Sequence, residues 1–290
     1  MAAHRSSPEV VPYRKIEVTP MDAALGAEIS GVDLSGDLDK EVFDEIRRAW
    51  LEHLVVFFCD QPLDDDRFLA FARRIGTPDR YPFVRGLDEH PEIIAVTKLP
   101  HEKVNFGGIW HSDTVYLEQP PMGTMLIARE IPPAGGDTLY ANMYVAYDAL
   151  SPGMQRMLAP LKAVNSSALA DVSKTREERI CGASDQEASR QVFEAVHPVV
   201  RTHSETGRKA LYVNVAHTAR FEGMTEEESR PLLEFLFRHQ VREEYTCRFR
   251  WSVGAIALWD NRCAQHNPMN DYHGYKRVLH RITLRGNRPV

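Results

Sequence analysis

Three stretches of the chain carry apolar residues at helical spacing, with charged residues between them. The first covers residues 39–53, and the second begins at Asp64, which can cap a helix. The third covers residues 225–240 and is the clearest, because Thr225 and Glu228 form a capping box in front of its apolar face. These patterns predict three amphipathic helices that pack against a common core.

Short apolar or alternating runs predict a larger number of strands. They lie at residues 15–18, 27–30, 54–58, 92–97, 123–128, 245–251, 255–259 and 278–285, and a pair of short helices is expected at 142–158. Many spaced strands with grouped helices predict a mainly β fold with flanking helices, a double-stranded β-helix of the jelly-roll type. No linker divides the chain, so we expect a loose tail at 1–12 and a single domain at 13–290.

Composition narrows the class of protein. The 290 residues are 43% hydrophobic and carry a net charge of −6, with Lys and Arg dispersed among Asp and Glu, so we expect no nucleic-acid partner. The richest apolar run, residues 54–58, is too short to span a bilayer, which predicts no membrane contact. Four cysteines without a Cys-x-x-Cys pair favour a reducing, cytoplasmic location. The sequence leaves open whether the protein forms a homo-oligomer, either a dimer or a tetramer.

The most informative motif is Trp110-His111-Ser112-Asp113, with His266 far downstream. Residues two apart on a strand point the same way, so His111 and Asp113 can reach one ion. Two imidazoles and one carboxylate leave three coordination positions open, which is the facial arrangement of non-heme Fe(II) sites. A His-x-Asp spacing also arises by chance, and for the spacing alone an ordinary polar loop is the simpler interpretation.

Residues that could bind anions surround this motif. Thr138 follows a Gly-Gly-Asp turn, and Arg277 and Arg281 follow His266 by 11 and 15 residues. Both arginines share parity on the last predicted strand, so they face the same way, and two arginines inside a barrel would be costly without anions. The alternative is a solvent-exposed face, because the opposite face of this strand is mostly apolar.

In these residues the sequence resembles the taurine dioxygenase and aryloxyalkanoate dioxygenase family of Fe(II)/2-oxoglutarate enzymes. The resemblance runs from about Ile16 to the C-terminus and is strongest in the blocks 110–116, 132–149, 211–214, 222–251 and 259–285. It implies the same jelly roll, with His111, Asp113 and His266 as the catalytic iron ligands. The implied reaction uses 2-oxoglutarate and O2 as co-substrates and hydroxylates, or thereby cleaves, the substrate with release of succinate and CO2.

The resemblance also implies binding residues. Thr138 and Arg277 would bind the distal carboxylate of 2-oxoglutarate, and Arg281 would pair with an anionic group of a small organic substrate such as an alkyl sulfonate, alkyl sulfate or aryloxyalkanoate. The chain departs from the taurine pattern, because Tyr81, Val84 and Gly107 replace a His, a Tyr and an Asn. Taurine itself is therefore not the expected substrate. The substrate pocket is expected to contain Arg281, Tyr81, Val84, Gly107, Thr114 and His217.

Some alternatives stay open. A non-catalytic barrel that binds metal, or metal and a 2-oxo acid, as a sensor or binding module, competes with the enzyme. A module that bound metal alone would have no need of Thr138 and Arg277. Residues 77–110 could line a substrate entrance or only connect two strands, and residues 166–194 could form a lid or a solvated helical excursion. The remaining histidines are expected to be solvated: His53, His90, His101, His197, His203, His239 and His273.

Overall fold

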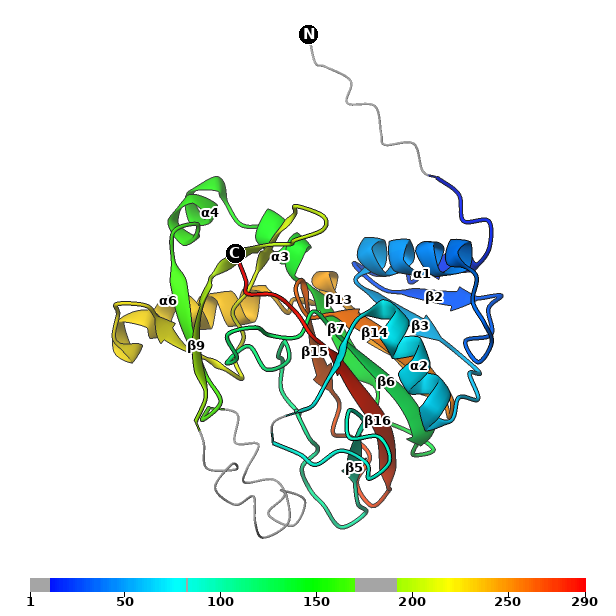
Figure 1. Ribbon diagram of the computed structural model, residues 1–290. Helices are drawn as coiled ribbons and strands as arrows, with labels where there is room; N and C mark the ends of the chain where they lie inside the picture. Colours follow the sequence, from blue (N-terminus) through cyan, green and yellow to red (C-terminus); the bar gives the residue numbers. More distant parts are fainter. Residues whose placement is uncertain (1–10, 82, 170–191) are drawn as a thin grey trace.

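A large, mainly antiparallel sheet forms the centre of the computed structural model, which describes residues 11–81, 83–169 and 192–290. In order across the sheet, its strands are β1 (Glu17–Pro20), β2 (Ala27–Ser30), β3 (Val55–Phe58), β14 (Ile256–Asp260), β6 (Gly123–Glu130), β16 (Arg277–Leu284) and β4 (Pro78–Asp79). β5 (Ile94–Lys98) pairs with β16 as well, and among the described strand pairs only β2 and β3 run parallel. β6 and β16 cross the middle of the molecule side by side (Figure 1).

A second sheet packs against the inner face of the first. It consists of β13 (Thr246–Phe249), β7 (Thr138–Asn142) and β15 (Ala264–Pro268), all antiparallel. Leu126 of β6 and Leu279 of β16 share one core cluster with Tyr140 of β7, so the two sheets enclose a common interior. Two opposed antiparallel sheets of this kind are the jelly roll expected from the sequence, and that prediction of fold class is confirmed.

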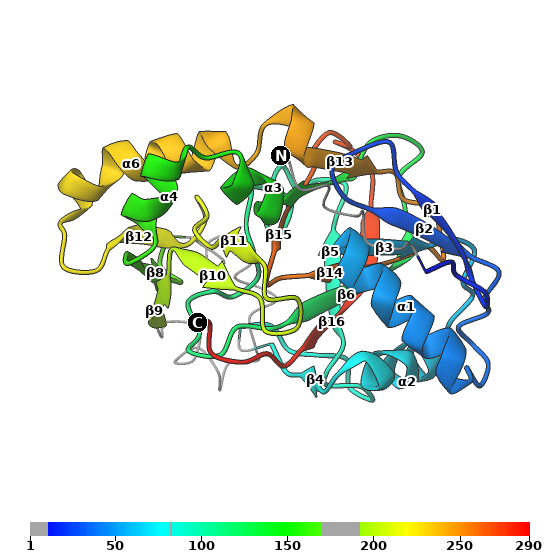
Figure 2. The same ribbon diagram turned by 90° about the horizontal axis from the view of Figure 1, so that it is seen from above.

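The outer face of the large sheet is covered by α1 (Lys40–His53) and α2 (Asp65–Ile75), which lie together on one side of the molecule (Figures 1 and 2). Each helix begins where an aspartate side chain accepts a backbone N–H of the first turn. The second core cluster joins Trp50 of α1 and Phe68 of α2 to Ile127 and Ile282 of the sheet. The large sheet is therefore buried on both faces.

Burial on both faces explains why β16, the last strand, has apolar residues on one face and buried arginines on the other. Ile282 and Leu284 pack under the helices, whereas Leu279 packs between the sheets. Arg277 and Arg281 face the interior with only 3% and 5% of their surface exposed. The prediction that both arginines point into the barrel is confirmed, and the solvent-exposed alternative is wrong.

The remaining elements form a layer on the other side of the molecule (Figures 1 and 2). They are β8 (Lys162–Ser166), β9 (Glu194–Pro198) and β12 (Thr218–Phe221) in one sheet, β10 (Val200–Thr202) with β11 (Lys209–Leu211), the 3-10 turn Glu243–Tyr245, and the helices α3 (Met143–Asp148), α4 (Pro152–Leu158) and α6 (Glu226–His239). The expected capping box of α6 and the helix pair α3–α4 are confirmed.

Some sequence predictions fall outside the described residues. These are most of the proposed tail at 1–12 and most of the proposed lid at 166–194. Across residues 11–81, 83–169 and 192–290, no helix has the length and apolar character needed to cross a membrane.

The prediction of solvated histidines was wrong for three of them. His197, His203 and His239 are buried, and each ring nitrogen Nε2 has a hydrogen-bond partner. The partners are Leu117 O at 2.9 Å, Asp260 Oδ2 at 3.0 Å and Ala146 O at 2.7 Å, respectively. The hydrogen bond to this partner replaces the water that a buried imidazole loses. Such a partner comes from a distant part of the chain, so the local sequence does not reveal it.

Candidate active site

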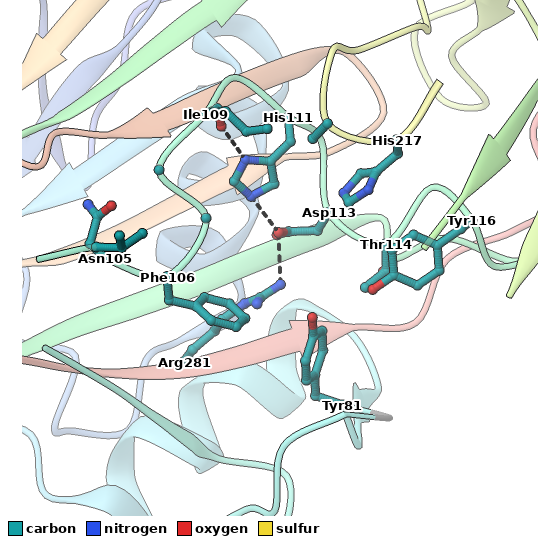
Figure 3. Close-up of a pocket in the computed structure, with 14 residues that line it drawn as sticks. Tyr81, Asn105, Phe106, Ile109, His111, Asp113, Thr114, Tyr116, His217 and Arg281 are labelled. Atoms are coloured by element: carbon teal, nitrogen blue, oxygen red, sulfur yellow. Dashed lines mark hydrogen bonds and ion pairs between the residues drawn. The ribbon is translucent and has the colours of Figure 1, made fainter. Parts of the chain in front are cut away.

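His111 and His266 are held opposite each other by a single β-bridge. The backbone N of His111 donates to His266 O at 3.0 Å, and His266 N donates to His111 O at 2.8 Å. The spacing from His111 predicted that Asp113 lies on the same strand. Asp113 lies instead in the turn that follows His111. Asn261 Oδ1 accepts the backbone N–H of Asp113 at 3.2 Å, which fixes this turn against the end of β14. The three side chains nevertheless converge (Figure 3).

Their ligand atoms lie within 4.8 Å of one another, and all three residues are buried. Asp113 Oδ1 is 3.5 Å from His111 Nε2 and 3.9 Å from His266 Nε2. His111 Nδ1 lies 2.7 Å from the carbonyl of Ile109. Because a carbonyl oxygen only accepts, Nδ1 is the donor in this contact, and Nε2 is the nitrogen on the side of Asp113.

Buried polar groups also orient the Asp113 carboxylate. Thr124 donates to Asp113 Oδ2 at 2.6 Å, and Asn261 Nδ2 donates to Thr124 Oγ1 at 2.8 Å. Arg281 Nη2 lies 2.9 Å from the other oxygen, Oδ1. Burial opposes ionisation, but the positive charge of Arg281 holds the pKa of Asp113 well below its usual range.

The donor set fits a divalent transition metal. Burial, followed by the neighbouring His111, lowers the pKa of His266 well below its usual range, so this imidazole is neutral and able to coordinate. Two imidazole nitrogens and one ionised carboxylate oxygen on one side of a point leave further positions for ligands, as the predicted facial site requires. The structure brings together the three residues that were predicted from the sequence.

A second cluster of potential ligands does not fit a metal. His203, Asp260 and Cys263 are close and buried. However, Arg262 bonds both oxygens of Asp260, at 2.8 and 2.6 Å, and His203 Nε2 also lies 3.0 Å from Oδ2. The other nitrogen of His203, Nδ1, accepts the backbone N–H of Glu205 and Thr206. Both ring nitrogens of His203 are thus occupied, so this cluster is a hydrogen-bonded structural network.

An inner cavity extends from the triad between the two sheets. Thr138, Arg277 and Arg281 line it together with all three members of the triad. Trp251 Nε1 donates to Thr138 Oγ1 at 3.0 Å, which leaves the threonine hydroxyl proton for another acceptor. Arg277 Nε and Nη2 are buried without a hydrogen-bond partner among the described residues, and burial lowers the pKa of this guanidinium.

An outer cavity of about 270 Å³ lies on the other side of the triad (Figure 3). The predicted pocket residues that line it are Tyr81, Gly107, Thr114, His217 and Arg281. Further lining residues, which were not predicted, are Val104, Asn105, Phe106, Gly108, Ile109, Tyr116 and Ala216. Most of these stand within the residues 77–110, so that segment does line a cavity and is more than a connector.

The prediction for Val84 is not met, because this residue is absent from the cavity lining. Its neighbour Phe83 is the buried residue, with its ring 5.9 Å from Tyr81 and 5.8 Å from Tyr116. Residues in an irregular segment have no fixed periodicity, so their spacing in the sequence does not show which side chains point into the cavity.

The backbone conformation at residue 107 and its closeness to His111 also favour glycine over any other residue there. The φ of Gly107 is +72°, and a Cβ at this position would lie 3.0 Å from His111 Cε1. A side chain here would be strained and would press on the ring of His111.

Arg281 brings a permanent positive charge to the outer cavity and lies 5.1 Å from the centre of the Tyr81 ring. Burial, followed by the nearby His111, lowers the pKa of His217 to about 3, so its imidazole is neutral near pH 7. Burial raises the pKa of both Tyr81 and Tyr116, which therefore stay protonated. Apart from Arg281 and its ion-pair partner Asp113, the cavity thus presents neutral side chains at His217, Tyr81 and Tyr116.

Comparison with known proteins agrees with this geometry. The family profile "Taurine catabolism dioxygenase TauD, TfdA family" matches residues 17–283. The chain belongs to this family. The family and the dioxygenase class that the sequence predicted are thereby confirmed.

Individual relatives cover nearly the whole chain. An alpha-ketoglutarate-dependent sulfate ester dioxygenase of Pseudomonas putida is 34% identical over 283 residues, which is 95% of this chain and 91% of the relative. An alpha-ketoglutarate-dependent 2,4-dichlorophenoxyacetate dioxygenase of Cupriavidus pinatubonensis is 32% identical over 92% of this chain and 97% of the relative. The crystal structure of a taurine dioxygenase from Burkholderia xenovorans superposes with a TM-score of 0.80 at 34% identity, covering 96% and 93% of the two chains.

Proposed function

We propose that this protein is an Fe(II)- and 2-oxoglutarate-dependent dioxygenase that hydroxylates a small anionic organic substrate. The observation that carries the proposal is the meeting of two cavities at one ligand triad. His111, Asp113 and Arg281 line both the inner and the outer cavity. A co-substrate on one side and a substrate on the other would therefore reach the same metal ion.

His111, Asp113 and His266 would hold the iron and leave three positions for co-substrate and dioxygen. When bound, the iron would supply O2 activation coupled to oxidative decarboxylation of 2-oxoglutarate, which releases succinate and CO2. The protein side chains keep the ligands in place for this chemistry. The Ile109 carbonyl fixes the tautomer of His111, and Thr124 holds the carboxylate of Asp113 in its orientation.

The inner cavity would bind the distal carboxylate of 2-oxoglutarate. Arg277 offers a planar fork that suits a carboxylate, and Thr138 keeps a hydroxyl proton that can be donated to it. Because both residues are buried, their bonds to an anion would not be screened by water. A barrel that only binds metal has no need of this second charged site, so the site supports a protein that binds a 2-oxo acid as well as a metal.

The outer cavity would bind the substrate with its anionic group on Arg281. The remaining walls suit an apolar body, because Phe106, Ile109 and Tyr116 line the cavity and the polar rings of His217 and Tyr81 are uncharged. The relatives named for a sulfate ester and for 2,4-dichlorophenoxyacetate support an alkyl sulfate or an aryloxyalkanoate as the substrate class. Hydroxylation at the carbon that bears the oxygen would then fragment the product.

The test is substrate-dependent formation of succinate. The purified protein is supplied with Fe(II), ascorbate, O2 and 2-oxoglutarate and screened against alkyl sulfates, alkyl sulfonates and aryloxyalkanoates. We expect at least one of these acids to raise succinate formation well above the uncoupled rate, with an equal yield of oxidised product. Tight binding of 2-oxoglutarate without turnover of any acid in the panel would favour the sensor instead.

A further inference from the structure

A second cation, Lys98, is buried beside Arg277, behind the residues that line the inner cavity. In the register of β5 and β16, Lys98 stands directly opposite Arg277, and Ile94 stands opposite Arg281. Residues that face each other across an antiparallel pair project to the same side of the sheet. Lys98 therefore points toward the interior like Arg277, and only 2% of its surface is exposed.

Both cations lie against the same phenol ring. Lys98 Nζ is 4.3 Å from the centre of the Tyr272 ring, and Arg277 Cζ is 5.8 Å from it. Lys98 Nζ has no hydrogen-bond partner within the described part of the chain, and neither have two of the guanidinium nitrogens of Arg277. Contact with an aromatic ring recovers only part of the hydration that a buried ammonium loses.

The acidic groups around this pair are engaged elsewhere. Asp137 pairs with Arg248 at 2.6 Å, and Asp271 accepts the backbone N–H of Gly136 at 2.7 Å. Glu102, the acid nearest to Lys98 in sequence, accepts the backbone N–H of Leu99 at 2.5 Å. Among the described residues, no carboxylate is hydrogen-bonded to the Lys98 ammonium or to Nε and Nη2 of Arg277, so an incoming anion would stabilise this pair of cations strongly.

We propose that Lys98 is a specificity-determining residue for the co-substrate and adds a second positive charge at the subsite for the distal carboxylate. The inference rests on the proposed use of 2-oxoglutarate. It states that Lys98 and Arg277 together set the preference for a dicarboxylic over a monocarboxylic 2-oxo acid. The Tyr272 ring contacts both cations.

The test is a comparison of two 2-oxo acids of equal length. 2-Oxoglutarate and 2-oxovalerate both have five carbons and can chelate a metal alike, but only the first has a distal carboxylate. Binding of each acid to the Mn(II)-loaded protein is measured by titration calorimetry for the wild type, Lys98→Met, Lys98→Gln and Arg277→Met. Lys276→Met is the matched control, because Lys276 directly precedes β16, is half-exposed and pairs with Glu130 at the end of β6.

We expect Lys98→Met and Lys98→Gln to weaken 2-oxoglutarate binding on the order of tenfold to a hundredfold while 2-oxovalerate binding stays unchanged. Lys276→Met should match the wild type for both acids. Unchanged 2-oxoglutarate binding in both Lys98 variants would overturn the inference, and so would an equal loss for both acids, which would indicate a packing role. If the wild type failed to bind 2-oxoglutarate at all, the proposed function itself would fall. A loss of 2-oxoglutarate binding in Arg277→Met alone would leave that function standing without Lys98.

Discussion

Arg281 Nη2 lies 2.9 Å from Asp113 Oδ1, the same oxygen that faces both imidazoles of the triad. The guanidinium that we assign to the substrate is therefore in direct contact with the carboxylate that we assign to the metal. An anion that pairs with Arg281 would be placed beside the metal, and its own charge would weaken the hold of Arg281 on Asp113. Arg281 would thus both place the substrate beside the metal and connect the charge of the substrate to the Asp113 carboxylate.

Loss of a triad residue should abolish turnover. We expect His111→Ala, Asp113→Ala or His266→Ala to remove succinate formation and to lower the bound iron measured after anaerobic gel filtration, because each variant deletes a donor atom. His273→Ala is the matched control, since His273 is exposed and lines neither cavity. Full activity in Asp113→Ala would contradict the assignment.

Arg277→Ala should raise the requirement for 2-oxoglutarate strongly. Removing the charged partner of a buried carboxylate costs roughly 2–5 kcal/mol. Thr138→Ala should cost less, on the order of 1–3 kcal/mol, because it removes a single neutral donor. Anaerobic titration with 2-oxoglutarate measures both effects. Normal binding by Arg277→Ala would mean that the distal carboxylate has another partner.

The triad and the two buried arginines were predictable because they have local signals. His111 and Asp113 form a recognisable pair, and the shared parity of Arg277 and Arg281 showed that they face one side. Lys98 had no such signal, because its role depends on pairing with Arg277 across β5 and β16, and the predicted strand stopped at residue 97. Long-range register is set by the packing of the whole sheet.

Errors in the irregular segments have the same origin. Val84 was expected to line the pocket, but Phe83 is the buried residue there. The turn at Asp113 was taken for a strand because both conformations can place His111 and Asp113 near one ion. Spacing limits which side chains can meet, but only tertiary contacts such as that from Asn261 to the Asp113 backbone decide which conformation occurs.

Gly107→Ala should weaken metal binding more than it weakens the fold. The positive φ of +72° would cost about 1–2 kcal/mol for a residue with a Cβ, and this Cβ would also press on the His111 ring. Gly207→Ala is the matched control, because Gly207 has a φ of +68° but a Cβ added there would meet no atom within 4 Å. Urea unfolding should show similar losses for the two variants, and metal titration should show a loss for Gly107→Ala alone. Equal metal affinity would contradict the contact.

The buried hydrogen-bonded network at Asp260 should make the free energy of unfolding fall at acidic pH. Burial opposes ionisation, but Arg262 and then His203 lower the pKa of Asp260 to about 2. A carboxyl with a folded pKa below its unfolded pKa stabilises the fold above the unfolded value of about 4, and this contribution is lost as pH falls toward the folded pKa. By pH 3 the loss should reach about 1 kcal/mol. Urea unfolding at pH 5, 4 and 3 measures it, and Asp260→Asn should be less stable at pH 5 yet show a shallower acid dependence.

Substrate preference should follow Arg281 and the apolar walls around it. A pocket that lacks the polar partners of a bound group discriminates against it by about 10²-fold. The resemblance places Tyr81 and Gly107 where the taurine enzymes carry a His and an Asn. We therefore expect kcat/KM for taurine to be far below that for longer alkyl sulfates or aryloxy acids. Arg281→Met should remove the preference for anions, whereas Arg285→Met, an exposed arginine on the same chain segment that pairs with Asp79, should keep it. Taurine as the best substrate would refute the pocket argument. An anion preference that survived in Arg281→Met would place the substrate's charge on a different residue.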